Sequence, residues 1–204
     1  MSHRVITEAS PAGEMSQIGA AQTPEDKAPE EKAPKAQTQE VQTQEVQTQE
    51  AIRGEEGPDR PLAIIMRGLP GSGKSHWVNA FLASHSDGEA IRRRGYFSTD
   101  DRFICEGEYR FDASKLSEYH QLNLSGFIQA LSRREPVVIC DNTNMAHWEF
   151  MAYDAAAKAM GYQVRILLIG DPLDKAHQAL CAERNQHGLG LRQIQTMASQ
   201  FQQL

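Results

Sequence analysis

The feature that most constrains this chain is the eight-residue stretch Gly68–Ser75, which reads Gly-Leu-Pro-Gly-Ser-Gly-Lys-Ser. It matches the pattern GxxxxGKS, a phosphate-cradling loop that follows a strand and opens a helix. The apolar run Leu62–Met66 predicts the strand, and residues 75–82 can form the helix. Glycines let the backbone N–H groups turn inward at a helix N-terminus, where they form a nest for anions. The stretch therefore predicts that the chain binds a nucleoside triphosphate.

The side chains of this loop indicate how the nucleotide is held. Lys74 places a positive charge on the β- and γ-phosphates, and the hydroxyl of Ser75 is a ligand for Mg²⁺. ATP and Mg²⁺ are therefore the expected cofactors. The residues expected to bind the nucleotide are Gly68, Pro70, Gly71, Ser72, Gly73, Lys74 and Ser75. The alternative interpretation is a glycine-rich strand-to-helix turn with a chance lysine.

Residues 1–60 differ in composition from the rest of the chain. They are rich in Glu, Gln, Thr, Ala and Pro and carry the whole net charge of −6, whereas residues 61–204 hold equal numbers of acidic and basic side chains. Such a segment buries too little apolar surface to offset its ordering entropy. The pentapeptide repeat in residues 36–50 fits no helical stripe. We therefore predict a disordered, acidic, low-complexity tail over 1–60, a spacer or an arm for a protein partner, and one ATP-binding domain over 61–204.

The remaining composition argues against several classes of protein. The three cysteines are far apart and form no CxxC pair, which favours free thiols in a reducing cytoplasm over a disulfide framework. No apolar run approaches the roughly 18 residues that span a bilayer. The neutral charge of residues 61–204 provides no global basic field for nucleic acid. A cytoplasmic protein with no membrane partner is expected.

From residue 61 on, short apolar runs alternate with longer periodic segments, as in βα units around a mainly parallel sheet. Besides a first strand that runs to Arg67, strands are expected at Gly95–Ser98, Val137–Cys140 and Tyr162–Ile169. After the helix that follows the loop, helices are expected at Ala113–Arg134, Trp148–Met160, Asp171–Arg184 and Leu191–Gln203. The pattern predicts an α/β fold of three layers with four to five strands. The first strand should be central, because phosphate sites lie at the carboxyl ends of such strands.

Several details of these elements are also predicted. Asp171 should be the N-cap of its helix, with Pro172 in the first turn. Leu116 should belong to the buried face of the helix over residues 113–134. Trp148 is expected in the core, with stacking on a ligand as the alternative. The basic cluster Arg92–Arg94 is expected in a solvated loop, with steering of a phosphate-bearing acceptor as the alternative.

The cluster Ser98-Thr99-Asp100-Asp101-Arg102 follows the second strand and should lie at the edge of the sheet near the phosphates. A carboxylate at this edge can accept the proton of an attacking hydroxyl group, which is the base role in phosphoryl transfer. The sequence does not decide which of the two aspartates points inward. Asp101 and Arg102 are candidates for contacts with the substrate. The alternative is an N-cap in a solvated turn.

Two further clusters are expected at the same edge. Asp141 ends an apolar strand, as in the Walker-B pattern, and is expected to hold Mg²⁺ directly or through water. Asn142 and Asn144 next to it can hydrogen-bond the phosphate or the acceptor, unless they only form a polar turn. Arg184, in the cluster Glu183–Gly188, could close over the phosphates and neutralise transition-state charge, or it could be a solvated residue at a helix C-terminus.

In their order along the chain, these motifs resemble a known family. GLPGSGKS, STDD, DNTN with the following HWE segment, and ERNQHG are similar to the polynucleotide-kinase-like group of P-loop ATP-binding domains over about residues 63–201. The resemblance implies a P-loop fold of the kinase type. It also implies that Asp100 is the general base and that Arg184 is the arginine of the lid.

The chain departs from the polynucleotide 5′-kinases at two positions. Those kinases have an arginine that grips the acceptor phosphate where this chain has Phe103, although Arg102 is adjacent. They also read DTN where this chain reads DNTN, which leaves Asp141 or Asn142 as the counterpart of their aspartate. Both departures concern the acceptor side.

We therefore expect a phosphotransferase that moves the γ-phosphate of ATP to a hydroxyl group. Its catalytic residues would be Lys74, Asp100 and Arg184, and its metal-binding residues Ser75 and Asp141. The acceptor would be a nucleic-acid 5′ end or a small hydroxylated molecule. The alternatives are a nucleotide-dependent binding module with little or no transferase activity, and a small-molecule kinase.

Overall fold

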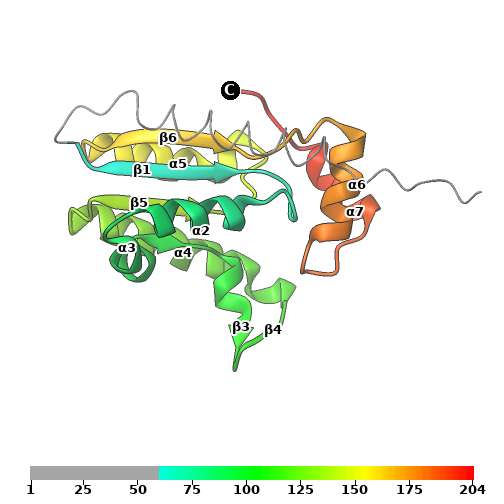
Figure 1. The fold of residues 1–204 in the computed structure, drawn as a ribbon, viewed down its shortest axis with the longest axis horizontal. Helices are drawn as coiled ribbons and strands as arrows, with labels where there is room; N and C mark the ends of the chain where they lie inside the picture. Colours follow the sequence, from blue (N-terminus) through cyan, green and yellow to red (C-terminus); the bar gives the residue numbers. More distant parts are fainter. Residues whose placement is uncertain (1–59) are drawn as a thin grey trace, which may run out of the picture. The chain divides into compact units, whose positions relative to one another are not determined.

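The computed structural model describes residues 60–204, so the predicted tail and the domain boundary that it sets lie outside the described residues. A sheet of four parallel strands forms the middle layer, in the order β2, β5, β1, β6 (Figure 1). These strands are Tyr96–Phe97 (β2), Val137–Asp141 (β5), Leu62–Arg67 (β1) and Gln163–Leu168 (β6). The predicted α/β fold is confirmed, and β1 is an inner strand, with β5 on one side and β6 on the other.

Helices cover both faces of the sheet. On one face lie α2 (Lys74–Ser84) and α3 (Gly88–Arg94), and on the other lie α4 (Leu116–Ser132) and α5 (His147–Ala159). The last two helices, α6 (Lys175–Arg184) and α7 (Leu191–Ala198), pack on each other at the end of the sheet where β1 ends (Figure 1). Successive side chains of a strand point to opposite faces. Ile64 and Met66 of β1 accordingly pack with α2 and α3, whereas Ala63 and Ile65 pack with α4 and α5. Because both faces are covered, β1 and β5 are apolar throughout most of their length.

Four short elements follow β2: a 3₁₀ helix and two strands that were not predicted, and a second 3₁₀ turn at the beginning of the helix predicted over residues 113–134. The 3₁₀ helix Asp100–Phe103 (η1) leads into a hairpin of Ile104–Cys105 (β3) and Glu108–Tyr109 (β4), and a second 3₁₀ turn, Ala113–Lys115 (η2), precedes α4. Glu106 and Gly107 form the turn of the hairpin with φ angles of 54° and 82°. Positive φ at both central residues is the requirement of a tight type I′ hairpin turn. The buried ring of Phe103 holds the hairpin by contacting Tyr109, Phe111 and Tyr119.

The predicted beginning of α6 and the predicted end of α7 are wrong. Asp171 forms a local turn, because its Oδ1 accepts a hydrogen bond from the backbone N–H of Leu173 at 2.8 Å. The N-cap is Asp174, which accepts from the backbone N–H groups of Ala176 and His177. α7 ends at Ala198 because the chain after it leaves the helix and forms a backbone hydrogen bond with Met145.

Three side-chain placements also differ from the predictions. Trp148 lies on the outer surface of α5 and is 71% exposed, so it is not a core residue. Leu116 begins α4 and is exposed. Arg92–Arg94 form the last turn of α3, a helix that was not predicted, where positive side chains are favoured by the helix dipole. No helix in residues 60–204 has the length and apolarity that crossing a membrane would require.

Arg67 connects the end of β1 to the C-terminal segment. It is only 2% exposed, and its guanidinium donates to the backbone carbonyls of Asn144, Met145 and Gln202 at 2.7–2.8 Å. Its guanidinium carbon also lies 4.8 Å from the centre of the Phe150 ring and 4.9 Å from that of Phe201. These contacts satisfy a buried charge that would otherwise be costly.

Candidate functional site

The phosphate-binding loop lies between the carboxyl end of β1 and α2, next to α6. Gly71 and Gly73 have φ angles of 81° and 103°, a region that residues with side chains rarely adopt. A Cβ at Gly71 would also collide with the backbone carbonyl of Cys181 in α6. The loop passes directly into the N-terminus of α2. The backbone therefore has the glycines and the helix N-terminus that phosphate binding requires.

Lys74, the first residue of α2, is buried beneath the loop. Its ammonium group donates to the carbonyls of Gly68 and Leu69, both at 3.0 Å, which leaves one of its three N–H donors for a phosphate oxygen. Burial lowers the pKa of Lys74, while the charges of Asp141 and Asp100 act in the opposite direction. The lysine predicted to hold the phosphates and the two predicted carboxylates are thus close enough to act on one another electrostatically.

Asp141 lies beside the loop because of the register of the sheet. Parallel pairing sets it opposite Met66, two residues before the loop begins. Its Oδ2 accepts hydrogen bonds from Ser75 Oγ at 3.1 Å and from the hydroxyl of Tyr96 at 2.9 Å. Burial, followed by the charge of Asp141, raises the pKa of Tyr96 and keeps this hydroxyl protonated as a donor. The two predicted metal-binding residues, Ser75 and Asp141, are therefore in direct contact.

The second oxygen of Asp141 fits the predicted magnesium site. Asp141 is 4% exposed, and its Oδ1 is buried without a hydrogen-bond partner. A buried carboxylate oxygen without a partner is costly, so this oxygen fits a cation or its bound water, and the magnesium site stays a prediction. Within residues 60–204 no group of three or more His, Cys, Asp or Glu side chains could hold a metal ion.

Asp100 and Asp101 begin η1 and point to different neighbours. The side chain of Asp100 is 55% exposed, and its Oδ2 lies 3.6 Å from Nε2 of His187. Its carboxylate accepts a hydrogen bond from Tyr109, whose pKa is raised to about 12 by burial and by this negative charge. Asp101 faces Asp141 instead, and its pKa is raised by burial and by that carboxylate, with Arg92 acting in the opposite direction.

The predicted substrate residues are placed unequally. Arg102 donates a hydrogen bond to the backbone carbonyl of Leu122 in α4. Asn144 is buried, and its side-chain amide donates a hydrogen bond to the backbone carbonyl of Met66. Asn142 accepts a hydrogen bond from the backbone N–H of Thr99 at 3.0 Å and so ties the end of β5 to the loop that carries Asp100. Asn142 and Asn144 support the walls of the site, and contacts of these residues with a substrate stay a prediction.

Arg184 is the last residue of α6 and is exposed. Its charge and that of Lys74 both lower the pKa of Cys181, although burial, the larger effect, raises it. Arg184 therefore lies at the end of the helix that contacts the loop. The following turn is organised by Asn185, whose amide donates to the carbonyls of Cys181, Ala182 and Leu189 and accepts from the N–H groups of His187 and Leu189.

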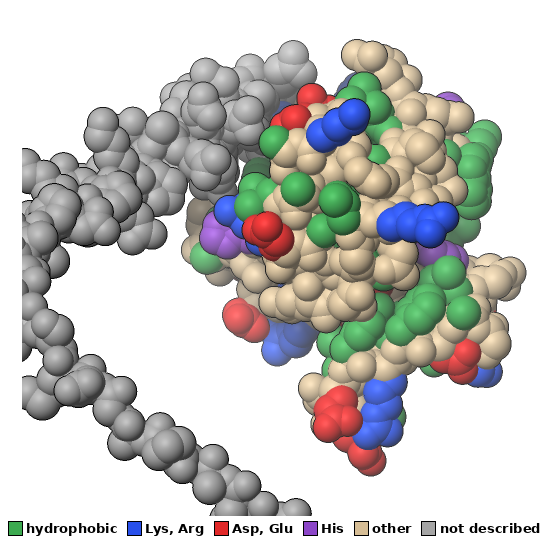
Figure 2. Space-filling model, turned by 90° about the vertical axis from the view of Figure 1, so that its right-hand side faces the viewer, with side chains coloured by type: hydrophobic (Ala, Val, Ile, Leu, Met, Phe, Trp, Pro, Cys, Tyr) green, Lys and Arg blue, Asp and Glu red, His purple; other side chains and the backbone are tan. Residues whose placement is uncertain are grey.

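Charges of both signs surround this end of the molecule. Figure 2 shows the side on which α6 and α7 lie, where acidic, basic and hydrophobic side chains are interspersed and no single basic field dominates. On the hairpin, Ile104 and Phe111 are more than half exposed, and Arg110 pairs with Glu108 at 2.9 Å.

Sequence reasoning missed four residues of the site: Tyr96, Tyr109, Asn185 and His187. The hairpin signal at Glu106-Gly107 and the asparagine between two helices could have indicated Tyr109 and Asn185. Nothing in the sequence pattern places Tyr96 against Asp141, because that contact depends on the neighbouring strands and their register.

Comparisons with known proteins agree with this geometry. Residues 64–204 match the model of the AAA domain family AAA_33. Human NEDD4-binding protein 2 is 32% identical over 68% of this chain, and human YLP motif-containing protein 1 is 29% identical over 72% of it. The matched region spans 8% of the length of each of these relatives. Among solved structures, Chaetomium thermophilum Kti12 in complex with ADP-AlF3 is 18% identical, with 69% of this chain and 80% of that chain covered and a TM-score of 0.45.

The loop, the adjacent carboxylate and the family match lead to one assignment. The match covers the phosphate-binding loop, Asp100, Asp141 and the α6–α7 turn. The P-loop at the carboxyl end of β1 is therefore part of an α/β domain of this family. The chain belongs to the AAA domain family AAA_33, whose model matches residues 64–204.

Proposed function

We propose that this domain binds ATP with Mg²⁺ and transfers the γ-phosphate to a hydroxyl group of an acceptor. The observation that carries the proposal is the contact of Ser75 with the buried carboxylate of Asp141, directly beside Lys74. A nucleotide loop, a cation site and a second carboxylate at the same edge of the sheet are the parts of a phosphoryl-transfer site.

On the donor side, the residues act mainly by position and charge. The N–H groups of Gly71–Ser75 and the ammonium of Lys74 bind the β- and γ-phosphates. Ser75 and Asp141 hold the magnesium shell, and bound Mg²⁺ would neutralise charge that develops on the phosphates. Arg184, at the end of α6, supplies a further positive charge when the turn that follows it lies over the loop.

On the acceptor side, Asp100 is the base. Its carboxylate takes the proton of the attacking hydroxyl while the oxygen forms its bond to the γ-phosphorus and the bond to ADP breaks. Asp100 is half exposed, so an acceptor can reach it, and its electrostatic interaction with Lys74 supports a role close to the phosphates. Asp101 and Asn142 are further candidates for contacts with the acceptor.

The acceptor is a nucleic-acid 5′ end or a small hydroxylated molecule. Neither Phe103 nor Arg102 is positioned to bind an acceptor phosphate. Phe103 is buried among aromatic rings, and Arg102 donates a hydrogen bond to a backbone carbonyl of α4. The exposed ring of Phe111 offers instead a surface on which a base can stack. A small-molecule kinase remains the alternative within the same reaction class.

The test is a panel of acceptors with ATP labelled in the γ-phosphate. The full chain is incubated with 5′-hydroxyl oligonucleotides, nucleosides and small polyols, and labelled products are counted. Transfer to one class and its loss in Lys74→Ala, with an unchanged circular-dichroism spectrum, is the expected result. Unchanged transfer in Lys74→Ala would contradict the proposed donor site.

One observation favours a second function, a nucleotide-dependent binding module. Asp100 contacts Tyr109 from the hairpin and His187 from the α6–α7 turn, so a change in the nucleotide site can reach two surface segments. ATP binding without transfer to any member of the panel would support the module. The N-terminal residues would then be the arm that docks a protein partner.

The location of the protein also belongs to the proposal. We propose the cytoplasm, because the three cysteines are far apart in the sequence and form no CxxC pair.

A further inference from the structure

The two oxygens of Asp141 have different surroundings. Oδ2 accepts two hydrogen bonds, from Ser75 at 3.1 Å and from Tyr96 at 2.9 Å, whereas Oδ1 is buried without a partner. Two donors on the same oxygen fix the rotation of the carboxylate about its bond to Cβ. They therefore determine which oxygen faces the cation site.

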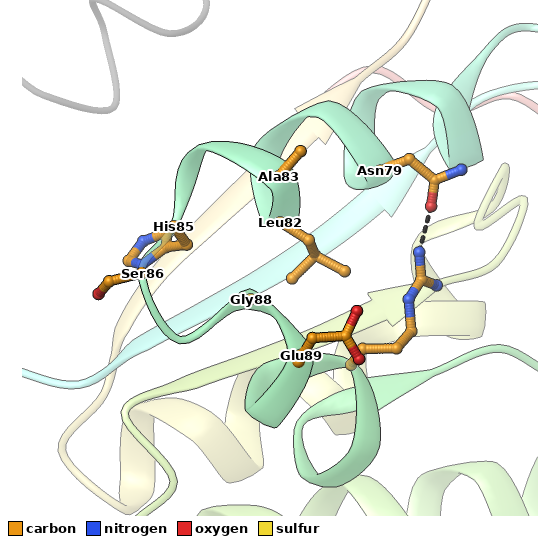
Figure 3. Close-up of a pocket in the computed structure, with 8 residues that line it drawn as sticks. Asn79, Leu82, Ala83, His85, Ser86, Gly88 and Glu89 are labelled. Atoms are coloured by element: carbon orange, nitrogen blue, oxygen red, sulfur yellow. Dashed lines mark hydrogen bonds between the residues drawn. The ribbon is translucent and has the colours of Figure 1, made fainter.

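Tyr96 is itself held from the opposite side. The guanidinium carbon of Arg92 lies 4.4 Å from the centre of its ring, and Arg92 donates a hydrogen bond to Asn79 in α2. This hydrogen bond, shown as the dashed line at Asn79 in Figure 3, joins α2 to α3 beside a groove of about 340 Å³. The groove is lined by Asn79, Leu82, Ala83, His85, Ser86, Gly88, Glu89 and Arg92.

These contacts form a continuous series from the groove to the metal site. Asn79 orients Arg92, Arg92 covers the ring of Tyr96, and the hydroxyl of Tyr96 orients Asp141. A guanidinium over the face of a tyrosine ring is attracted to it electrostatically, and the hydrogen bond to Asn79 limits the positions that this guanidinium can take. Groups that orient a metal ligand from behind affect metal affinity without contacting the metal.

We propose that Tyr96, held by Arg92, is a positioning residue that presents Oδ1 of Asp141 to the magnesium shell of bound ATP. The inference rests on the proposed function only as far as binding of ATP with Mg²⁺, and it does not require phosphate transfer. Without the hydroxyl of Tyr96, Oδ2 keeps the hydrogen bond from Ser75, and this single donor allows the carboxylate to turn. The groups that bind ATP without a metal ion, namely the loop and Lys74, are unaffected.

The experiment measures the dissociation constant of ATP by titration calorimetry in excess Mg²⁺ and again in EDTA. The ratio of the dissociation constant in EDTA to that in excess Mg²⁺ reports how strongly the metal supports binding. In Tyr96→Phe, which keeps the ring under Arg92, this ratio should fall about 10-fold, as is typical for loss of a group behind a metal ligand. The dissociation constant in EDTA should stay unchanged.

Two matched controls separate positioning from general destabilisation. Tyr162→Phe also removes a partly buried hydroxyl, which donates to the backbone of Glu135, and it should leave the ratio unchanged. Arg92→Gln should lower the ratio by less than Tyr96→Phe does, whereas Arg94→Gln on the same helix, which breaks an ion pair with Glu135, should not. Arg92→Gln also serves as the test if Tyr96→Phe fails to fold.

A double-mutant comparison tests the route through Asp141. In an Asp141→Asn background, Tyr96→Phe should have no further effect on the ratio, because the group that it orients is already changed. An unchanged ratio in Tyr96→Phe, or an equal fall in the Asp141→Asn background, would overturn the inference. Absence of ATP binding in the wild-type chain would instead overturn the proposed function, so the two failures are distinguishable.

Discussion

The donor and acceptor sides of the candidate site are built in opposite ways. On the donor side, Lys74 and Asp141 are 8% and 4% exposed, and both are hydrogen-bonded to regular elements or to the loop between them. On the acceptor side, the side chain of Asp100 is 55% exposed. It is positioned by a 3₁₀ helix, by a hairpin whose strands have two residues each, and by a turn. A rigid frame thus carries the nucleotide groups, whereas short connecting segments carry the groups that would meet the acceptor.

This difference separates the part of the site that tolerates little change from the part that can vary. Positions at the carboxyl ends of inner strands are set by sheet register, which tolerates little change. Segments outside the sheet tolerate substitution and insertion and so can change specificity. The same donor site can therefore serve different acceptors. The predictions below probe the two sides separately.

The largest effect is expected at the proposed base. Asp100→Asn should lower phosphate transfer by about 100-fold or more, because a positioned general base contributes at least this much. ATP affinity should stay unchanged, since Asp100 lies on the acceptor side. The matched variant is Asp101→Asn, which faces Asp141 and should weaken binding in Mg²⁺ more than it affects transfer. Transfer that survives in Asp100→Asn would mean that another group is the base.

The next largest effect concerns the support of the hairpin. Phe103→Ala removes a ring that is 3% exposed and contacts three other aromatic rings, so it should cost about 3 kcal/mol of stability. Thermal unfolding followed by circular dichroism measures the loss. Phe111→Ala, at an exposed position, should cost much less. Equal losses in the two variants would show that the buried ring does not anchor the hairpin.

A smaller effect is expected where the α6–α7 turn meets Asp100. His187→Gln removes a partly exposed contact at 3.6 Å and a ring that lies 4.6 Å from that of Tyr109. Exposed ion pairs contribute at most about 1 kcal/mol, so kcat/KM for the acceptor should fall by less than about 5-fold. His85→Gln, at the end of α2, is the control. A loss as large as that of Asp100→Asn would assign His187 a direct part in proton transfer.

The smallest effect is expected from removal of residues 1–58. If this segment is a spacer, its deletion should change neither the thermal midpoint nor the dissociation constant of ATP. Calorimetry on the shortened and full chains provides both quantities. A lower midpoint or weaker ATP binding would contradict the spacer prediction.

The sequence was informative where a strong local pattern coincides with the sheet. β1, β5 and the helix α5 were predicted within a residue or two because continuous apolar runs and a phosphate-loop motif leave few alternatives. The prediction failed where two local signals competed. Asp171 and Asp174 are both good N-caps, and the helix begins at the second because the first already accepts from Leu173.

The rest of the site could not be predicted because it depends on contacts between distant segments. The contact of Tyr96 with Asp141 joins residues on neighbouring strands, and that of Asp100 with His187 joins η1 to the turn after α6. A single sequence carries no signal for such pairs. Trp148 illustrates the opposite error, since a helical pattern gives the spacing of a face but not which side of it is covered.

The close approach of Gly71 to Cys181 has a thermodynamic consequence. Because a Cβ at Gly71 would strike the carbonyl of Cys181, the loop and α6 share a surface without spare room. Phosphates that order the loop must then also restrict α6, and coupling of this kind is reciprocal. Consider a molecule that binds α6 and α7 and favours one arrangement of them. It would change the affinity for ATP by the same factor by which ATP changes the affinity for that molecule.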